Sequence, residues 1–124
     1  MKKDQIFIIT KNGSELNLSI LRENLPWLRN KKWMKSTWKH KTALIDKKSG
    51  SMRLYIGQEF NDKDFEIKPG AWLHDHCDLC TTGIFENDII YISEYEMICE
   101  ECYLNFAEPE DVELRIRQLK QILK

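Results

Sequence analysis

The stretch HDHCDLCTTGIFENDIIYISEYEMICEECY, residues 74–103, contains all four cysteines of this 124-residue chain. Cys77 and Cys80 form one C-x-x-C pair, Cys99 and Cys102 form a second, and eighteen residues separate the pairs. A two-residue spacer lets a tight turn point both sulfur atoms at one ion, and two such pairs supply the four ligands of a tetrahedral site. We therefore expect one structural zinc ion (Zn2+), held by these four cysteines.

Other uses of the four thiols fit the sequence less well. A redox C-x-x-C pair requires a βαβ unit, and none surrounds either pair. Disulfides require an oxidising compartment, whereas the polar N-terminus MKKDQIFIIT is not typical of a secretory signal. Four cysteine ligands alone do not distinguish a zinc site from an iron site. Rubredoxin-type iron sites usually have a glycine soon after each pair, but Thr81 and Tyr103 follow here, so we favour zinc.

Residues 72–108 resemble the treble-clef and zinc-ribbon superfamily of small metal modules. In the treble-clef form, the first cysteine pair lies on a knuckle, a β-hairpin follows, and the second pair begins a helix. The resemblance implies hairpin strands at residues 84–85 and 89–93, a turn at 86–88, and a helix from Cys99 to Phe106. It identifies a type of module and no particular family.

The chain divides by charge near residue 70. Residues 1–70 contain 15 Lys or Arg and 8 Asp or Glu, whereas residues 71–124 contain 4 and 12. Four thiolates on one divalent ion would make the second part still more negative. We expect a basic β-rich lobe (1–70) and an acidic zinc-binding lobe (71–124), and we interpret the short chain as one compact domain.

The remaining segments predict an α+β fold with an antiparallel N-terminal sheet. A short helix is expected from Ser19, ended or kinked by Pro26; a helix starting at Ser14 is the alternative. The expected apolar face of the helix from Ser19 consists of Ile20, Leu21, Leu25 and Leu28. Pro69-Gly70 predicts a turn. The expected strands are residues 5–10, 16–18, 42–46 and 52–56, the last with Met52, Leu54 and Ile56 on one buried face. Asn12-Gly13 predicts a turn that joins the first two strands, and residues 47–50 predict a turn that joins the last two as a hairpin.

A last amphipathic helix is expected to begin at Pro109. Its apolar stripe consists of Val112, Ile116, Leu119 and Leu123.

Two histidines, His74 and His76, precede the first cysteine pair. Because four thiolates close a tetrahedron, we expect these side chains to support the site from outside its ligand shell. A metalloenzyme that uses His74 or His76 stays a third interpretation. Nucleobase deaminases need H-x-E, and treble-clef nucleases place a catalytic histidine between their cysteine pairs; residues 81–98 contain none. We therefore expect no enzymatic activity.

Residues 27–41 combine tryptophans with a run of basic residues. Lysines can neutralise phosphates while indoles stack on bases, so this segment is a candidate nucleic-acid surface. The alternative is a strand that packs its indoles inward and leaves its lysines in solvent. The candidate partner surface consists of Lys31, Lys32, Trp33, Lys35 and Lys39.

The sequence thus predicts a small cytoplasmic zinc-binding protein that acts by binding another protein, as an adaptor, an inhibitor or an immunity-type partner. A nucleic-acid-binding module is the runner-up, since nucleic-acid-binding domains are usually basic and this chain has a net charge of −1. No apolar run approaches the roughly 20 residues of a membrane helix, so we expect no membrane partner.

Overall fold

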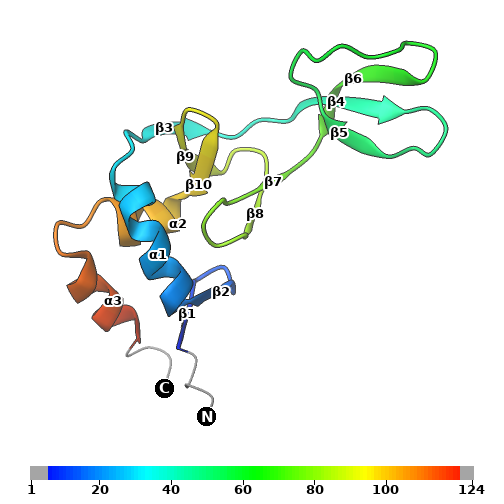
Figure 1. The fold of residues 1–124 in the computed structure, drawn as a ribbon. Coiled ribbons are helices and arrows are strands. Elements are labelled where there is room, and N and C mark those ends of the chain that lie inside the picture. Colours follow the sequence, from blue (N-terminus) through cyan, green and yellow to red (C-terminus); the bar gives the residue numbers. More distant parts are fainter. Residues whose placement is uncertain (1–5, 121–124) are drawn as a thin grey trace.

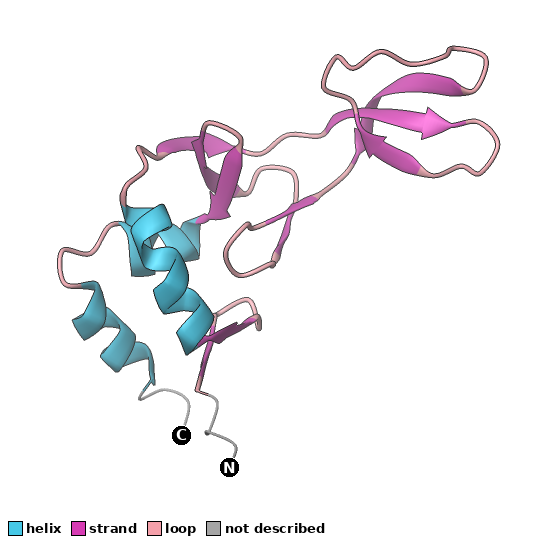
Figure 2. Ribbon diagram, in the orientation of Figure 1, coloured by secondary structure: helices cyan, strands magenta, loops and turns pink. Residues whose placement is uncertain are grey.

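The computed structural model describes residues 6–120, and Figure 1 shows a larger part that contains the helices and a smaller sheet that projects from it. Helices combine with antiparallel strand pairs, so the fold class is α+β, as predicted. Figure 2 shows the helices gathered on the side of the larger part that faces away from the projecting sheet. Within residues 6–120, no helix combines the length and the apolar character needed to cross a bilayer.

The N-terminal hairpin and the first helix form around a glycine turn and an asparagine cap. Strands β1 (Phe7–Ile9) and β2 (Glu15–Asn17) pair antiparallel, and Gly13 in the turn has a φ of 87°. Helix α1 (Leu18–Arg29) begins where Asn17 Oδ1 accepts hydrogen bonds from the amides of Ser19 and Ile20. The hairpin is therefore present, and the alternative helix from Ser14 is wrong.

Helix α1 continues through Pro26, so of the two predicted effects of this proline, an end or a kink, the end of the helix is wrong. The residues buried at helical spacing are Leu18, Leu21, Leu25 and Leu28, so burial of Leu28 beyond the proline offsets the missing backbone hydrogen bond. Ile20, predicted on the buried face, is instead 55% exposed because it lies outside this stripe.

The central sheet of the larger part has the order β10-β9-β3. Strand β9 (Ile89–Ser93) lies between β10 (Glu96–Cys99) and β3 (Met34–Thr37), and both pairings are antiparallel. The predicted pairing of 84–85 with 89–93 is wrong, because β8 (Gly83–Ile84) pairs with β7 (Asp75–His76). The turn at 86–88 exists, with Asn87 at a φ of 73°, but the turn that folds β9 onto a neighbour is at 94–95.

The projecting sheet consists of β4 (Lys41–Asp46) between β5 (Met52–Leu54) and β6 (Phe65–Trp72). The predicted hairpin of β4 and β5 is confirmed. The buried face expected for residues 52–56 is not confirmed, because Met52 is 50% and Ile56 78% exposed.

The Pro69-Gly70 turn predicted from the sequence is instead an irregularity inside strand β6. The pairing register with β4 shifts between Lys41 and Ala43, and Gly70 has a φ of 74°. A proline without an N–H and a glycine with positive φ fit a bulge in an edge strand as well as they fit a turn.

The C-terminal segment forms α2 (Glu100–Cys102), the π-helix η1 (Tyr103–Ala107) and α3 (Val112–Lys120). Helix α3 begins later than predicted, because Asp111 Oδ1 accepts a hydrogen bond from the Leu114 amide and so fixes the start of the helix. Its predicted stripe packs inward, with Ile116 fully buried and Val112 and Leu119 beside the core; Leu123 lies outside the described residues.

The main hydrophobic core contains residues from before and after residue 70. Its largest buried side chains include Ile8, Leu21 and Trp38 from the first part and Phe106 and Ile116 from the second. Ala43 and Leu44, the buried residues of the projecting sheet, lie outside this cluster. Core packing thus groups segments from both charge-defined lobes, while the division into a basic lobe (1–70) and an acidic lobe (71–124) stays a prediction.

Candidate metal centre

The four cysteines meet at one buried point in the larger part. Their sulfur atoms all lie within 4.8 Å of one another. The Cys77–Cys102 and the Cys80–Cys99 sulfur pairs are each separated by 3.8 Å. A tetrahedron with metal–sulfur bonds of about 2.3 Å has edges of about 3.8 Å, so the four sulfurs stand where one tetrahedral ion needs them.

The first pair is positioned by a tight turn. The Cys77 amide donates to the Thr82 carbonyl and the Thr81 amide to the Cys77 carbonyl, at 2.9 Å each, and Thr81 has a φ of 64°. This turn directs the amides of Leu79 and Cys80 at Cys77 Sγ, each at 3.4 Å. The C-x-x-C spacing therefore provides two ligands and also two amides that stabilise a thiolate.

The second pair lies at the step from strand to helix. Cys99 ends β10, and Cys102 is buried in α2. The Cys99 amide donates to Cys77 Sγ at 3.3 Å, and Asp78 is joined to Met97 by two hydrogen bonds of 2.9 and 2.8 Å. These contacts fix the two halves of the cluster relative to each other.

The thiols cannot all ionise without a cation. Hydrogen bonds from Cys102, and then from Cys80 and Cys99, lower the pKa of Cys77. The hydrogen bond with Cys77, followed by those with Cys80 and Cys99, raises the pKa of Cys102. Four thiolates at these distances would repel one another, so full ionisation requires a positive ion at the centre. The donor set thus fits a tetrahedral metal ion in which protein sulfur fills every position.

His74 and His76 lie near the cluster in sequence but outside it in space. Both are exposed, their rings are 5.2 Å apart, and His74 stacks on Phe85 at 5.8 Å between ring centroids. Within residues 6–120, neither imidazole forms a hydrogen bond with a cysteine sulfur. The hydrogen bonds to Cys77 Sγ come instead from backbone amides. Support of the metal site by either histidine stays a prediction.

The tryptophan side chains of residues 27–41 mostly contact other residues of the folded chain. Trp38 is 1% exposed and its Nε1 donates to Asp75 Oδ2 at 2.9 Å. Trp33 is partly buried, donates from Nε1 to the Leu28 carbonyl at 2.7 Å, and packs edge-on against Trp27 at 5.8 Å.

The lysines of the same segment divide into two groups. Lys31 pairs with Glu96 at 2.7 Å, and Lys39 is hydrogen-bonded to Asn87. Lys32 and Lys35 are exposed and stand beside Met34, which is 73% exposed. The structure thus brings Lys31, Lys32 and Lys35 to one surface, where Lys31 is paired with Glu96, and directs Lys39 to another contact.

The Asp75 carboxylate is a polar centre that the sequence did not reveal. It accepts hydrogen bonds from Trp38, from Trp72 at 2.8 Å and from Lys41 at 2.9 Å. Burial would raise the pKa of Asp75, but the bonds from Trp72, Lys41 and Trp38 hold it below its usual value. No local spacing signals this cluster, because strand pairing brings its members together.

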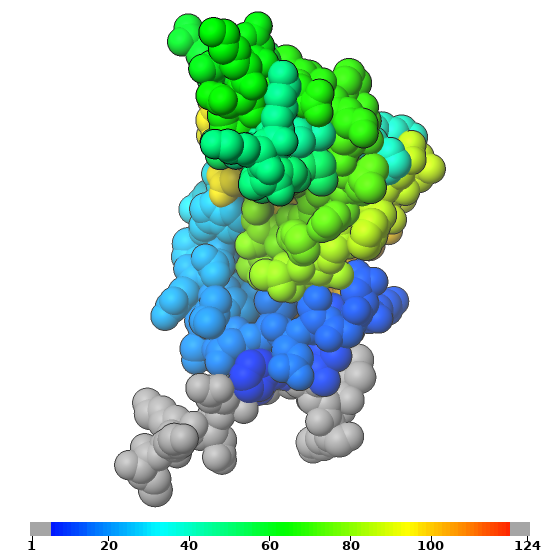
Figure 3. Space-filling model, turned by 90° about the vertical axis from the view of Figure 1, so that its right-hand side faces the viewer, coloured from blue at the N-terminus to red at the C-terminus, as the bar shows by residue number. Residues whose placement is uncertain are grey.

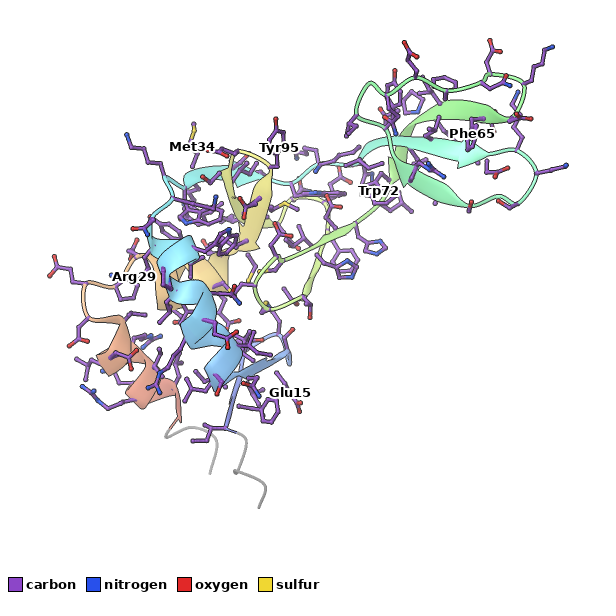
Figure 4. All side chains as sticks on the ribbon, in the orientation of Figure 1. Glu15, Arg29, Met34, Phe65, Trp72 and Tyr95 are labelled. Carbon is purple, nitrogen blue, oxygen red and sulfur yellow. The ribbon has the colours of Figure 1, made fainter. Side chains whose placement is uncertain are left out.

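A shallow groove beside β3 also has no signature in the sequence. Its volume is about 860 Å³. Met34 lines this groove, and Figure 4 shows Met34 and Tyr95 at the same end of the central sheet. We define the Met34 groove by Trp27, Lys31, Lys32, Met34, Lys35 and Ile92.

Comparison of the chain with protein-family models, with curated proteins and with solved structures finds no match.

Proposed function

We propose that this chain is a non-enzymatic protein-binding module whose larger part is held together by a structural zinc ion. The observation that carries the proposal is the closed cluster of four buried cysteine sulfurs. With sulfur at every tetrahedral position, there is no place for a metal-bound water, which zinc hydrolases require. The order of turn, strand pair and helix around the cluster supports a treble-clef type of module.

Zinc is the ion that we assign to this site. The pairs are not followed by the glycines common in rubredoxin-type iron sites, and zinc is the usual occupant of closed four-cysteine sites. The cysteines are free thiols and not disulfides, which suits a reducing compartment such as the cytoplasm.

The surface that we assign to a partner is the Met34 groove. Met34 and Ile92 lie directly opposite each other on paired strands and are 73% and 37% exposed. Lys32 and Lys35 stand exposed beside them. An apolar pair flanked by two exposed lysines favours an acidic protein segment with apolar anchors. Met34 thus replaces Trp33 as the proposed anchor, because Trp33 is engaged with Leu28 and Trp27.

Nucleic acid is the less favoured partner for the same segment. Stacking on bases needs an open indole face, and Trp38 is 1% exposed while Trp33 packs against Trp27. What remains is a small positive surface with no exposed aromatic platform from this segment.

The test begins with the macromolecule that the tagged, metal-loaded protein retains in nuclease-treated host extract. Binding of the purified partner is then measured for Met34→Ala and for Met52→Ala, an exposed methionine on the projecting sheet. We expect Met34→Ala to weaken binding at least about tenfold and Met52→Ala to leave it within about twofold. Retention of nucleic acid, with an affinity that falls steeply and log-linearly with salt, would contradict the proposal.

A further inference from the structure

A second groove borders the cysteine cluster at Cys99. Its volume is about 1050 Å³, and its lining includes four large apolar side chains that are exposed. Ile9 is 51%, Phe85 56%, Ile89 37% and Leu104 45% exposed. Figure 3 shows the yellow-green residues that follow the first cysteine pair lying directly beside the blue N-terminal hairpin, whose residues form the opposite wall. We call this the Phe85 groove.

The ring of Phe85 is exposed and also held in place. A Cβ atom at Gly83 would lie 2.9 Å from Phe85 Cε2, so the ring lies over the space that the glycine leaves empty. His74 stacks on the same ring, and the Phe85 amide donates to Asp88 Oδ2 at 2.8 Å. An aromatic ring fixed before binding loses little conformational entropy when a partner covers it.

The charge around the Phe85 groove is negative. Asp88, Glu100 and Glu101 line it, against Lys11 and Arg115. Arg115 donates to the neutral Asn105 Oδ1 from two nitrogens at 3.0 and 2.8 Å and keeps its charge, so the two cations offset two of the three carboxylates. Four thiolates on a divalent ion carry a net charge of about −2, and Cys99 forms part of the groove wall. The field in the groove therefore favours a cation.

We propose that the Phe85 groove is a second docking surface, which takes a protein segment with apolar side chains flanked by Lys or Arg. Four exposed apolar side chains supply the contact area, and the acidic residues of the lining supply the charge preference. This goes beyond the Met34 groove, whose lysines favour the opposite charge. With both surfaces in use, the chain would join an acidic segment to a basic one.

The experiment selects peptides on the zinc-loaded, full-length protein from a random library of short displayed peptides. We expect the enriched peptides to combine apolar residues with Lys or Arg. Their affinity should fall at least about tenfold on Phe85→Ala and stay within about twofold on Tyr95→Ala, a fully exposed aromatic residue outside the groove. Glu100→Gln with Glu101→Gln should weaken the same peptides and flatten the dependence of their affinity on salt.

Leu104→Ser is the second groove variant and keeps the test decisive if Phe85→Ala does not fold. Zinc content is measured in every variant, so that a loss of the metal centre is separated from a loss of the groove. An acidic consensus, an absence of enriched peptides, or equal binding by the groove variants at full zinc occupancy would overturn the inference. Met34→Ala should leave this binding unchanged, which separates it from the proposed function.

Discussion

Asp75 shows how much one carboxylate can organise at the scale of a residue. Its two oxygens accept hydrogen bonds from two indoles and one ammonium group, and all three donors come from the chain that leads into and out of the projecting sheet. Asparagine has nearly the same shape but no charge, and its amide nitrogen would face an N–H donor.

The first prediction follows for Asp75→Asn. We expect the free energy of unfolding to fall by about 1–3 kcal/mol, because one indole donor is left without an acceptor. Of the four tryptophans, only Trp38 and Trp72 should show shifted indole N–H signals in an NMR spectrum. Asp64→Asn, at an exposed position, is the control and should change the stability by less than about 0.5 kcal/mol. Unmoved Trp38 and Trp72 signals would disprove the assigned role.

The second prediction concerns Asp46, which closes the β4–β5 turn. Backbone hydrogen bonds from Lys48, and then from Ser49, hold the pKa of Asp46 below its ordinary value of 3.8. Because the folded pKa is depressed, the carboxylate stabilises the turn above the ordinary value, and this stabilisation is lost as the pH falls through the lower folded pKa. A carboxyl-carbon NMR titration should place the midpoint below 3.8. In Asp46→Asn, the Lys48 and Ser49 amide shifts should no longer respond to acid.

At the scale of the element, Arg29 joins the end of α1 to the end of the π-helix. Its guanidinium donates to the carbonyls of Phe106 at 3.0 Å, Ala107 at 3.3 Å and Glu110 at 3.4 Å. These carbonyls have no partners in a continuing helix, so the arginine acts as a cap supplied by another helix.

The third prediction is that Arg29→Ala lowers the free energy of unfolding by about 1–3 kcal/mol, measured by urea denaturation. Arg29→Lys should recover less than half of this loss, since a single ammonium group cannot reach three carbonyls. Arg117→Ala removes the same charge at an exposed position of α3 and should be nearly neutral. Equal effects of the two alanine variants would show that only net charge matters.

For the individual elements, the sequence predicts where the chain turns better than it predicts which strands pair with each other. The turn chemistry of Asn12-Gly13 and of residues 47–50 predicts two hairpins, and both are present. Asn87 also marks a real turn, but that turn separates β8 from β9, and their partners lie elsewhere along the chain. Proline and glycine at 69–70 fit a bulge and a turn equally well. Local chemistry decides whether the chain bends, whereas tertiary contacts decide which strands meet.

The cysteine cluster could be predicted because its information is local: the first pair fits one turn, the second fits a step from strand to helix, and the two pairs need only one hairpin between them. The two grooves could not be predicted from the sequence, because their walls come from segments that meet only in the folded chain. Ile9 and Leu104 are an example, separated in sequence and brought to one surface by the packing of the N-terminal hairpin on the helices.

At the scale of the whole molecule, the fourth prediction concerns metal removal. A structural zinc contributes on the order of 10 kcal/mol in zinc-finger peptides, which is comparable to the total stability of a small domain. Chelation, or Cys99→Ser, should therefore abolish cooperative unfolding of the larger part. Hydrogen exchange should show lost protection at Ile84 and Ile98, and elemental analysis of the native protein should find one zinc per chain. Full protection at both residues in metal-free protein would contradict the prediction.

The chain enters and leaves the projecting sheet at neighbouring points. Lys41 and Trp72 are register partners in the sheet, and Trp38 and Trp72 both bind Asp75. We therefore expect that residues 42–71 form an insert that can be removed without loss of the fold. A short Gly-Ser link from Lys41 to Trp72 should leave a smaller protein that still folds and still binds its metal ion. Metal stoichiometry and amide NMR signals of residues 84–106 would measure this, and unchanged signals would mean that the insert can vary in length and sequence without disturbing the metal centre.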